Sequence, residues 1–304
     1  MTDTKAPEHL PEVSMIILTM NRRLCLRSCL ESVYRQAFSD MEVIVVDNGS
    51  TDGTGDFVRR EFPDARYVRL EENAGAPAGR NHGIRRARGK ICVFIDDDAV
   101  FAGSGALEQA VACFRSDERL GLLAFRVLSP HDGLEEYKSI PRADKKRIDE
   151  DYECSYFCGA GFACRRRVFD EIGMFWEPLF FIGEELDLSY RLLEAGYRIR
   201  RASAISVVHH ETPQARAPGK WIYYVARNRF FVALRSLPWR YVASHGLLWW
   251  GHLLFVALRN RHPFFFLQGF RDALLGIPKV LKTRSCMSVE TLGEIRRLSG
   301  RVWY

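Results

Sequence analysis

Apolar residues in the first hundred positions form short β-branched runs, and stretches with helical spacing separate these runs. Each run is bounded by Gly, Asn, Asp or Pro, a pattern typical of buried strands. The runs lie at residues 13–19, 42–47, 66–70 and 91–95. Helices are expected over residues 26–37, 54–62 and 78–88. This alternation predicts an α/β fold with parallel strands and right-handed crossovers, in which ligands bind at the carboxyl ends of the strands.

The alternation of predicted strands and helices becomes less regular after residue 99. We expect a helix over 105–114, a strand over 121–127 and a polar stretch over 129–151, followed by a strand-like run within 156–166, a helix starting near 184 and a strand over 199–208. We expect the polar stretch to be a mobile loop. From about residue 220 the chain becomes rich in Trp, Phe, Leu and Arg. We therefore predict a catalytic domain over residues 12–212 and a helical C-terminal extension over residues 213–304.

Charge and cysteine content narrow the class of protein only slightly. The net charge of +6 has no long single-sign block, so anionic partners are favoured, but not nucleic acid specifically. Residues 1–13 contain acids and prolines and no apolar run, so no secretory signal or N-terminal anchor is expected and the protein should be cytoplasmic. The eight cysteines contain no CxxC pair, and we expect reduced, mostly buried thiols.

Polar residues follow two of the predicted strands. In VIVVDNGSTDGT, Asp47 and Asn48 end the apolar run, where they could bind a nucleobase or ribose. The structural alternative is an Asx-turn with Asp52 as the N-cap of the next helix. Arg80 follows the small-residue run NAGAPAG, and its planar fork suits a diphosphate or ribose. The alternative for Arg80 is a solvated arginine at a helix start.

Three carboxylates, Asp96, Asp97 and Asp98, follow the apolar run ICVFI. Three adjacent anions repel one another, and a divalent cation bound to hard oxygens would neutralise them. The pattern therefore predicts an Mg²⁺ or Mn²⁺ site, with Asp96 and Asp98 on the same side of an extended segment. Surface acids capping a helix are the structural alternative.

Glu184, Glu185 and Asp187 open the amphipathic helix that follows FFIG. A carboxylate desolvated by this apolar run suits a general base, although acids at a helix N-terminus are also favoured by the helix dipole. His209 and His210 end the last predicted strand, where one imidazole could be a third metal ligand. A buried structural histidine is the alternative.

These segments together resemble family 2 glycosyltransferases of GT-A fold, and the rhamnosyltransferase-like subgroup most. The resemblance rests on SMIILTMNRR, VIVVDNGSTDGT, NAGAPAGRNHG, FIDDDA, GAGFACRRRVFDEIGMF and FIGEELDLSYRLLEAGY, and it covers roughly residues 12–236. It implies a mixed, mostly parallel sheet flanked by helices. It also implies an inverting transfer of one sugar from a nucleotide-diphospho-sugar donor to a hydroxyl of a glycan, a lipid-linked or a small-molecule acceptor.

The resemblance implies roles for individual residues. Asp98, Asp96 and His209 would bind the metal ion. Glu185 would be the catalytic base, with Glu184 and Asp187 beside it. The donor would be held by Thr19, Asn21, Asp47, Asn48, Arg80, Asn81, Asp96 and Asp97, with Asp97 facing away from the metal pair.

Two features qualify the resemblance. The family usually has Glu-Asp where this chain has Glu184-Glu185, so the base is longer by one methylene. The QxxRW signature of processive synthases is not found, which favours addition of a single sugar.

A sugar nucleotidyltransferase is disfavoured because no glycine-rich phosphate loop follows the first strand. A non-catalytic nucleotide-sugar-binding module stays open.

The C-terminal helices suggest a further partner. Trp249, Trp250 and residues 264–266 are flanked by Arg259, Arg261 and Arg271, which is typical of helices at a membrane surface. We therefore expect peripheral contact with the inner face of the membrane, with packing onto the catalytic domain or a homodimer as the alternatives. A membrane-spanning helix is not expected, because His245 and His252 interrupt the longest apolar stretch.

Overall fold

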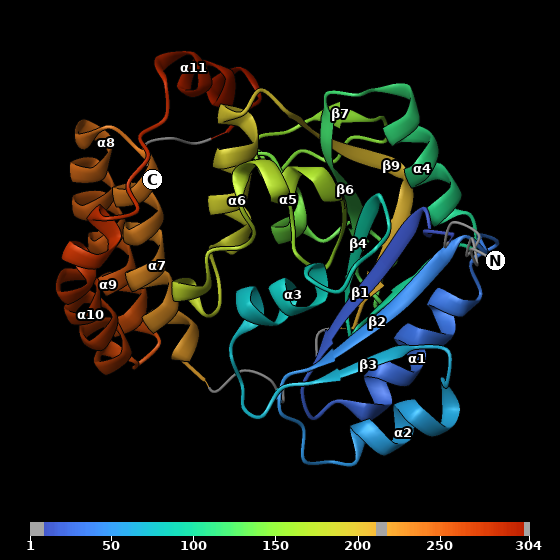
Figure 1. Ribbon diagram of the computed structural model, residues 1–304. Helices are drawn as coiled ribbons and strands as arrows, with labels where there is room; N and C mark the ends of the chain where they lie inside the picture. The colour runs from blue at the N-terminus through green and yellow to red at the C-terminus, as the bar shows by residue number, and fades with distance from the viewer. Residues whose placement is uncertain (1–8, 211–217, 301–304) are drawn as a thin grey trace, which may run out of the picture.

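The chain folds around one nine-stranded mixed β-sheet (Figure 1). A computed structural model describes residues 9–210 and 218–300. The strands are β1 (Val13–Thr19), β2 (Met41–Asp47), β3 (Arg66–Arg69), β4 (Ile91–Asp96), β5 (Ala99–Phe101), β6 (Leu120–Leu128), β7 (Tyr152–Glu153), β8 (Gly161–Arg165) and β9 (Arg198–His209). The four strands expected in the first hundred residues are confirmed, each within one residue at either end.

The strands follow the order β3-β2-β1-β4-β8-β6-β9-β5, and β7 pairs with β9. The pairs β1–β2, β1–β4, β2–β3 and β6–β9 are parallel. The pairs β4–β8, β6–β8, β5–β9 and β7–β9 are antiparallel. The predicted mixed, mostly parallel sheet flanked by helices is confirmed, since the parallel pairs align more residues than the antiparallel pairs do. Every pair among β1, β2, β3 and β4 is parallel, and in this part of the chain strands and helices alternate.

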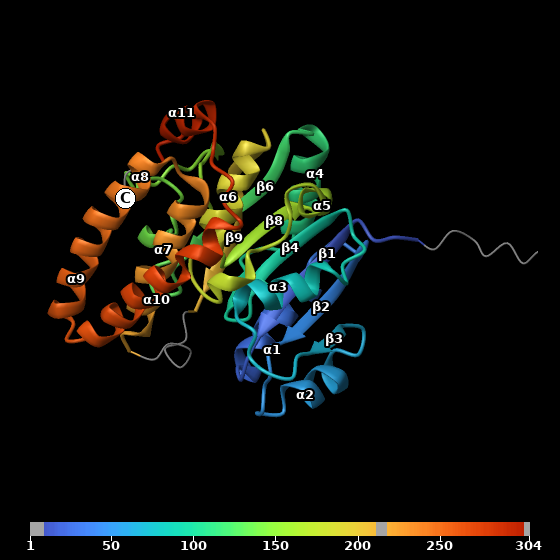
Figure 2. The ribbon, with the colours of Figure 1, turned by 60° about the vertical axis from the view of Figure 1, so that its left-hand side comes forward.

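Helices cover both faces of the sheet (Figure 2). They are α1 (Arg23–Tyr34), α2 (Thr54–Glu61), α3 (Ala76–Ile84), α4 (Ala106–Ser116), α5 (Arg166–Ile172) and α6 (Glu184–Glu194), with short 3₁₀ turns η1 (Tyr137–Ser139) and η2 (Glu177–Leu179). Successive side chains of a strand point to opposite faces. Met15 and Ile17 accordingly share a core with α1, α2 and α4, whereas Ile16 shares a core with α3, α5 and α6.

The register of the parallel strands brings the motifs together. Thr19 lies opposite Asp47 in the β1–β2 pair, and Leu18 lies opposite Asp96 in the β1–β4 pair. The polar residues that end β1, β2 and β4 therefore meet at one edge of the sheet. This is the edge at which open α/β sheets bind their ligands.

The C-terminal helices are α7 (Lys220–Ser236), α8 (Trp239–Ser244), the π-helical turn η4 (His245–Trp249), α9 (Trp250–Arg259), α10 (Pro263–Leu281) and α11 (Val289–Arg297). They lie beside the sheet, with α9 and α10 furthest from it (Figures 1 and 2). Phe231 of α7 and Leu292 of α11 belong to the same hydrophobic core as Phe94 of β4. The predicted domain boundary at residues 212–213 lies outside the described residues, and this core is continuous across it.

The polar stretch over residues 129–151 packs against the protein and is tied to β9 by an ion pair. Ile140 is fully buried, and the carboxylate of Glu135 accepts from Arg201 Nη2 at 2.6 Å, with both side chains buried. A buried ion pair of this kind fixes the local chain position, because separating the charges would leave each one desolvated. The expectation of a mobile loop therefore finds no support in these contacts.

Candidate active site

The metal-ligating set predicted from the sequence is brought together by strand pairing. Asp96 is the last residue of β4, and Asp98 lies in the turn before β5. Antiparallel pairing places Ala99 opposite His209 at the end of β9. As a result, His209 Nε2 lies 3.3 Å from Asp98 Oδ1, and ligand atoms of Asp96, Asp98 and His209 all lie within 4.8 Å of one another.

This set fits a divalent cation. Two carboxylates and an imidazole are ligands that Mn²⁺ accepts, and adjacent ligands of an octahedral ion lie about 3 Å apart. Burial opposes a charge on His209, but its hydrogen bond to Asp98 and the nearby carboxylates outweigh burial and raise its pKa. Glu136 Oε1 lies 3.8 Å from His209 Nδ1, which makes no hydrogen bond among the described residues. A carboxylate behind a ligating imidazole orients the ring.

Asp97 belongs to a different set of contacts. Thr19 Oγ1 donates to Asp97 Oδ2 at 2.7 Å, and Arg22 Nη1 donates to Asp97 Oδ1 at 2.8 Å and to Asp98 Oδ2 at 3.0 Å. Burial raises the pKa of Asp97 to about 6, although Arg22 and Thr19 oppose the shift. Asp97 thus ties β1 to the acidic turn through Thr19 and Arg22. The sequence analysis did not single out Arg22.

Arg80 connects the acidic turn to the start of α6. Its Nη2 donates to Asp96 Oδ1 at 3.2 Å, and its Nη1 donates to Glu184 Oε1 at 3.1 Å and lies 3.7 Å from Glu185 Oε1. The side chain is 7% exposed. The alternative of a solvated arginine is therefore wrong, and Arg80 supplies the positive charge between the two acidic groups.

Glu184 and Glu185 differ in their surroundings although they are adjacent. The Glu184 side chain is 3% exposed, whereas that of Glu185 is 24% exposed. Burial, reinforced by the charge of Glu185, raises the pKa of Glu184 to about 8. Burial also raises the pKa of Glu185, with Arg80 opposing the shift. A Cβ at Gly159 would lie 2.3 Å from Glu185 Oε1, so the absence of a side chain there makes room for this carboxylate.

Asp187 has its two oxygens occupied by the protein. It is fully buried on α6 and accepts from Arg191 Nε at 2.9 Å and Nη2 at 2.7 Å, and Arg235 of α7 donates to its other oxygen. These contacts join α6 to α7. They give Asp187 a role in packing and leave Glu184 and Glu185 as the acids that face Arg80.

The loop before α6 is shaped by contacts from α7. Phe180 and Ile182 have φ of 63° and 66°, a left-handed conformation that is strained for a β-branched residue such as Ile182. Asn228 of α7 is fully buried, and its Nδ2 donates to the carbonyls of Leu179, Phe181 and Ile182 at 2.9, 2.7 and 2.7 Å. The C-terminal helices thus hold the segment that positions Glu184 and Glu185.

The residues expected to bind the nucleotide line the edge formed by β1 and β2, but most are engaged with the protein. Asp47 accepts from the Ser50 amide at 2.7 Å and from the Tyr67 hydroxyl. Asn48 Nδ2 donates to Asn73 Oδ1 at 2.9 Å. These bonds order the two loops that follow the strands.

Asn21 and Asn81 are also held by loops. Asn21 Oδ1 accepts from the Thr51 amide at 2.7 Å. Asn81 exchanges hydrogen bonds with the backbone of Phe175 and donates to Glu177 Oε1 at 3.0 Å. Asn81 therefore faces the η2 segment, whereas Arg80 faces the acidic groups.

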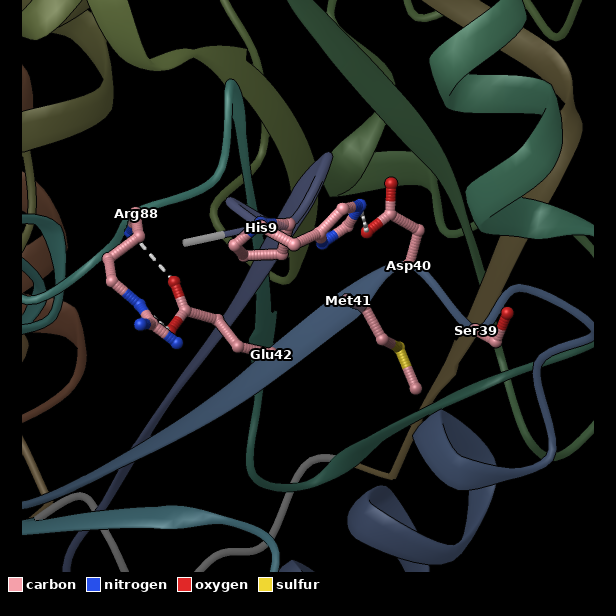
Figure 3. A pocket seen from close by; sticks show the side chains of 7 residues that line it. His9, Ser39, Asp40, Met41, Glu42 and Arg88 are labelled. Atoms are coloured by element: carbon pink, nitrogen blue, oxygen red, sulfur yellow. Dashed lines mark hydrogen bonds and ion pairs between the residues drawn. The ribbon is translucent and has the colours of Figure 1, made fainter. Parts of the chain in front are cut away.

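A separate hollow lies at the opposite end of the strands. Figure 3 shows its lining, which includes Met41, the first residue of β2, with Asp40 and Glu42 beside it. Its charged groups are paired with each other, His9 with Asp40 at 3.7 Å and Arg88 with Glu42 at 3.2 Å. The hollow does not include the acidic residues at the carboxyl ends of β1, β2 and β4.

The sequence matches one family across more than half of its length. The profile of glycosyl transferase family 2 matches residues 14–173, which include β1, β2, β4 and the acidic turn. The chain belongs to this family. This match confirms the predicted resemblance to family 2 glycosyltransferases. The rhamnosyltransferase-like subgroup stays a prediction, because the match does not test it.

Individual relatives agree with this membership. The putative glycosyltransferase EpsH of Bacillus subtilis is 40% identical over 91 residues, covering 29% of this chain and 26% of EpsH. A Campylobacter jejuni GalNAc(5)-diNAcBac-PP-undecaprenol β-1,3-glucosyltransferase is 34% identical over 102 residues, covering 32% of this chain and 33% of that protein. The chain thus spans about a quarter to a third of the length of these relatives.

The fold also matches solved structures. The mannosyltransferase PcManGT of Pyrobaculum calidifontis, solved with GDP-Man and Mn²⁺, superposes with a TM-score of 0.59 over 95% of this chain and 80% of its own, at 23% identity. This likeness confirms the predicted GT-A fold for the family member described here.

Proposed function

We propose that this family 2 protein is a glycosyltransferase that moves a single sugar from a nucleotide-diphospho-sugar to an acceptor hydroxyl, with a divalent cation and with inversion at the anomeric carbon. The observation that carries the proposal is the convergence of Asp96, Asp98 and His209 beside the Arg80-linked pair Glu184 and Glu185. Metal-ligating groups and a desolvated carboxylate within one site are what this transfer requires.

Asp98, Asp96 and His209 would hold Mn²⁺ or Mg²⁺. When bound, the ion would neutralise the donor diphosphate and stabilise the negative charge that develops on it as it leaves. Arg22 and Arg80 contact the same carboxylates and would offset their mutual repulsion when the donor is absent.

The donor would lie along the edge formed by β1, β2 and β4. Thr19, Asn21, Asp47 and Asn48 would shape the base and ribose side, mainly by ordering the loops after β1 and β2. Asp96 is more exposed than Asp97 or Asp98, which suits contact with the donor. Asn81 would contribute to donor binding indirectly, by holding the η2 segment through its hydrogen bond to Glu177.

Glu185 is the carboxylate best placed to act as base. It is the more exposed of the pair, and burial raises its pKa, which makes the carboxylate a stronger base. The acceptor oxygen would form its bond to the anomeric carbon as the bond to the diphosphate oxygen breaks, and the hydroxyl proton would move to Glu185. Direct displacement of this kind inverts the anomeric configuration.

Relatives suggest the class of acceptor. The Campylobacter jejuni relative is named for a glycan carried on undecaprenyl diphosphate. By analogy, we propose a glycan or lipid-linked acceptor used on the cytoplasmic side of a membrane, in cell-envelope polysaccharide or glycoconjugate synthesis.

A donor screen tests this proposal. Purified full-length protein would be incubated with UDP-, GDP- and dTDP-sugars and Mn²⁺, and release of nucleoside diphosphate would be measured with and without lipid-linked acceptors. We expect turnover with one donor class, and loss of turnover in excess chelator and in Asp98→Asn. Stabilisation by a nucleotide-sugar without turnover under any of these conditions would instead indicate a non-catalytic binding module.

A further inference from the structure

Helices α9 and α10 carry an apolar stripe that faces away from the protein. We call it the outer face and define it by Leu247 of the preceding turn η4, Phe255 and Leu258 of α9, and Phe264, Leu267 and Leu275 of α10. These side chains are 57–78% exposed. Within each helix they recur at spacings that place them on one side. Figures 1 and 2 show α9 and α10 at the margin of the molecule, furthest from the sheet.

The opposite side of the same helices is already packed. Leu253, Ala257 and Phe266 are buried in a cluster with Ile222 and Ala226 of α7. The outer face is therefore a second apolar surface rather than the ordinary core-facing stripe. A helix that is apolar on both sides needs a second apolar environment beyond the core of its own domain.

The charge of the chain is concentrated around this surface. Residues 239–284 contain seven Lys or Arg and one Asp or Glu, whereas the remaining residues contain 37 of each. The whole net charge of +6 therefore lies in the segment that carries the outer face. Arg259, Arg261, Lys279 and Lys282 are exposed near the ends of α9 and α10. Apolar residues flanked by cations complement an anionic lipid surface.

The packing of α9 favours a helix lying on the membrane over one crossing it. The helical run Trp239–Arg259 has 21 residues and is long and apolar enough to span, so the expected interruption at His245 and His252 does not break it. However, a third of its most apolar window is buried. Trp250 Nε1 donates to the Ala226 carbonyl at 2.9 Å, and its ring packs against Phe230 in a tilted arrangement and against Phe270 edge to face. Insertion across a bilayer would break these contacts with α7 and α10.

We propose that the outer face binds an anionic membrane, with α9 and α10 lying in the plane of the headgroups and the exposed cations contacting lipid phosphates. This attachment is independent of the sugar-transfer proposal, because it uses no residue of the candidate active site and is measured without substrates.

Vesicle flotation with the full chain tests the proposal. Vesicles of phosphatidylcholine alone would be compared with vesicles containing about 30% phosphatidylglycerol. We expect binding to the anionic vesicles and a decrease of at least about tenfold in the triple variant Leu247→Gln, Phe255→Gln, Leu275→Gln. The control variant Leu24→Gln, Leu134→Gln, Val289→Gln changes three exposed apolar residues elsewhere and should bind like the wild type.

The cations are tested separately with Arg259→Gln, Lys279→Gln, Lys282→Gln. Each cation near an anionic surface contributes about fivefold to binding, so this variant should also lose at least about tenfold on anionic vesicles. Equal binding by the wild type and both variants would overturn the proposal. It would also be overturned if the wild type sedimented as a dimer and the outer-face variant as a monomer with unchanged vesicle binding, because a second copy would then cover this face.

Discussion

The side-chain amide of Asn228 on α7 donates to the carbonyl of Ile182 at 2.7 Å, across 46 residues of sequence. Ile182 adopts a left-handed conformation two residues before Glu184, and the same amide also holds the carbonyls of Leu179 and Phe181. A helix of the C-terminal region therefore fixes the backbone from which the candidate base projects. The part of the chain beyond the family match thus contributes to the site.

Removing this amide should disturb the base more than the donor site. We expect Asn228→Ala to lower the free energy of unfolding by about 2 kcal/mol, because one buried and two partly buried carbonyls lose this donor. We also expect kcat to fall at least about tenfold with little change in donor affinity, because the loop before α6 would relax. Asn260→Ala is the matched control, since Asn260 is exposed and its side-chain amide donates to the Val256 carbonyl of the adjacent helix α9. Equal kcat in the wild type and Asn228→Ala would contradict the positioning role.

Gly159 should not tolerate a methyl group. A Cβ there would lie 2.3 Å from Glu185 Oε1 and 3.0 Å from Arg80 Nη2, so Gly159→Ala must displace the carboxylate from Arg80. We expect turnover to fall about a hundredfold while the folded state and its melting temperature are largely kept. At Gly103 a Cβ would meet nothing within 4 Å, so Gly103→Ala should retain activity in the same assay. A fully active Gly159→Ala would show that the position of Glu185 is not required.

Substitutions of Glu184 and Glu185 should lower the transfer rate to different extents. Removal of a general base commonly lowers the rate by about 10² to 10⁴ with little loss of ground-state binding. We therefore expect Glu185→Gln to bind donor with wild-type affinity and to lose transfer, and Glu184→Gln to lose less. Donor affinity and single-turnover rates would be measured for both variants. The reverse order of severity, or a product with retained anomeric configuration, would overturn the assignment.

Stability should fall as pH rises through neutrality because of Glu184. Burial raises the pKa of Glu184 to about 8 in the folded protein, above its ordinary value of 4.5. The folded state therefore binds more protons than the unfolded state between these values. The resulting stabilisation is full below pH 4.5 and is lost as pH rises to about 8.

Denaturant unfolding at pH 5 and pH 8.5 checks this dependence. We expect the free energy of unfolding of the wild type, relative to that of Glu184→Gln, to decrease by at least about 1 kcal/mol between the two pH values. Glu108→Gln, an exposed change on α4, should keep the wild-type pH dependence. Parallel curves for the wild type and Glu184→Gln would show that Glu184 is ionised throughout.

Asp187 should affect stability rather than chemistry. It is fully buried and pairs with Arg191 and Arg235, so Asp187→Asn would leave these two partly buried guanidinium groups without their counter-charge. We expect a loss of about 3 kcal/mol in the free energy of unfolding, with kcat per folded molecule within about threefold of the wild type. Asp56→Asn, which removes an exposed partner of Arg59, should cost less than about 0.5 kcal/mol. A stable but inactive Asp187→Asn would instead favour the catalytic role expected from the sequence.

The sequence by itself determined the elements whose signals are local. Short β-branched apolar runs located β1, β2 and β4, and period-3.6 patterns located the helices between them, because each strand is covered on both faces by helices that are close in sequence. The same strands end in Asp47 and Asp96, so the ligand-binding edge could be located before any contact was known. The acidic turn was recognisable because three adjacent carboxylates are unusual beside a buried strand.

Only the tertiary structure decided which charges meet. Antiparallel pairing of β5 with β9 joins Ala99 to His209 across more than a hundred residues, and no local pattern encodes that register. Arg80 and Glu184 are brought together over a similar separation, as are Arg22 and Asp97 over 75 residues. A side chain's partner depends on packing between elements that are distant in sequence. For this reason Asp187, an acid in the same motif as Glu184 and Glu185, lies in a structural ion pair with Arg235.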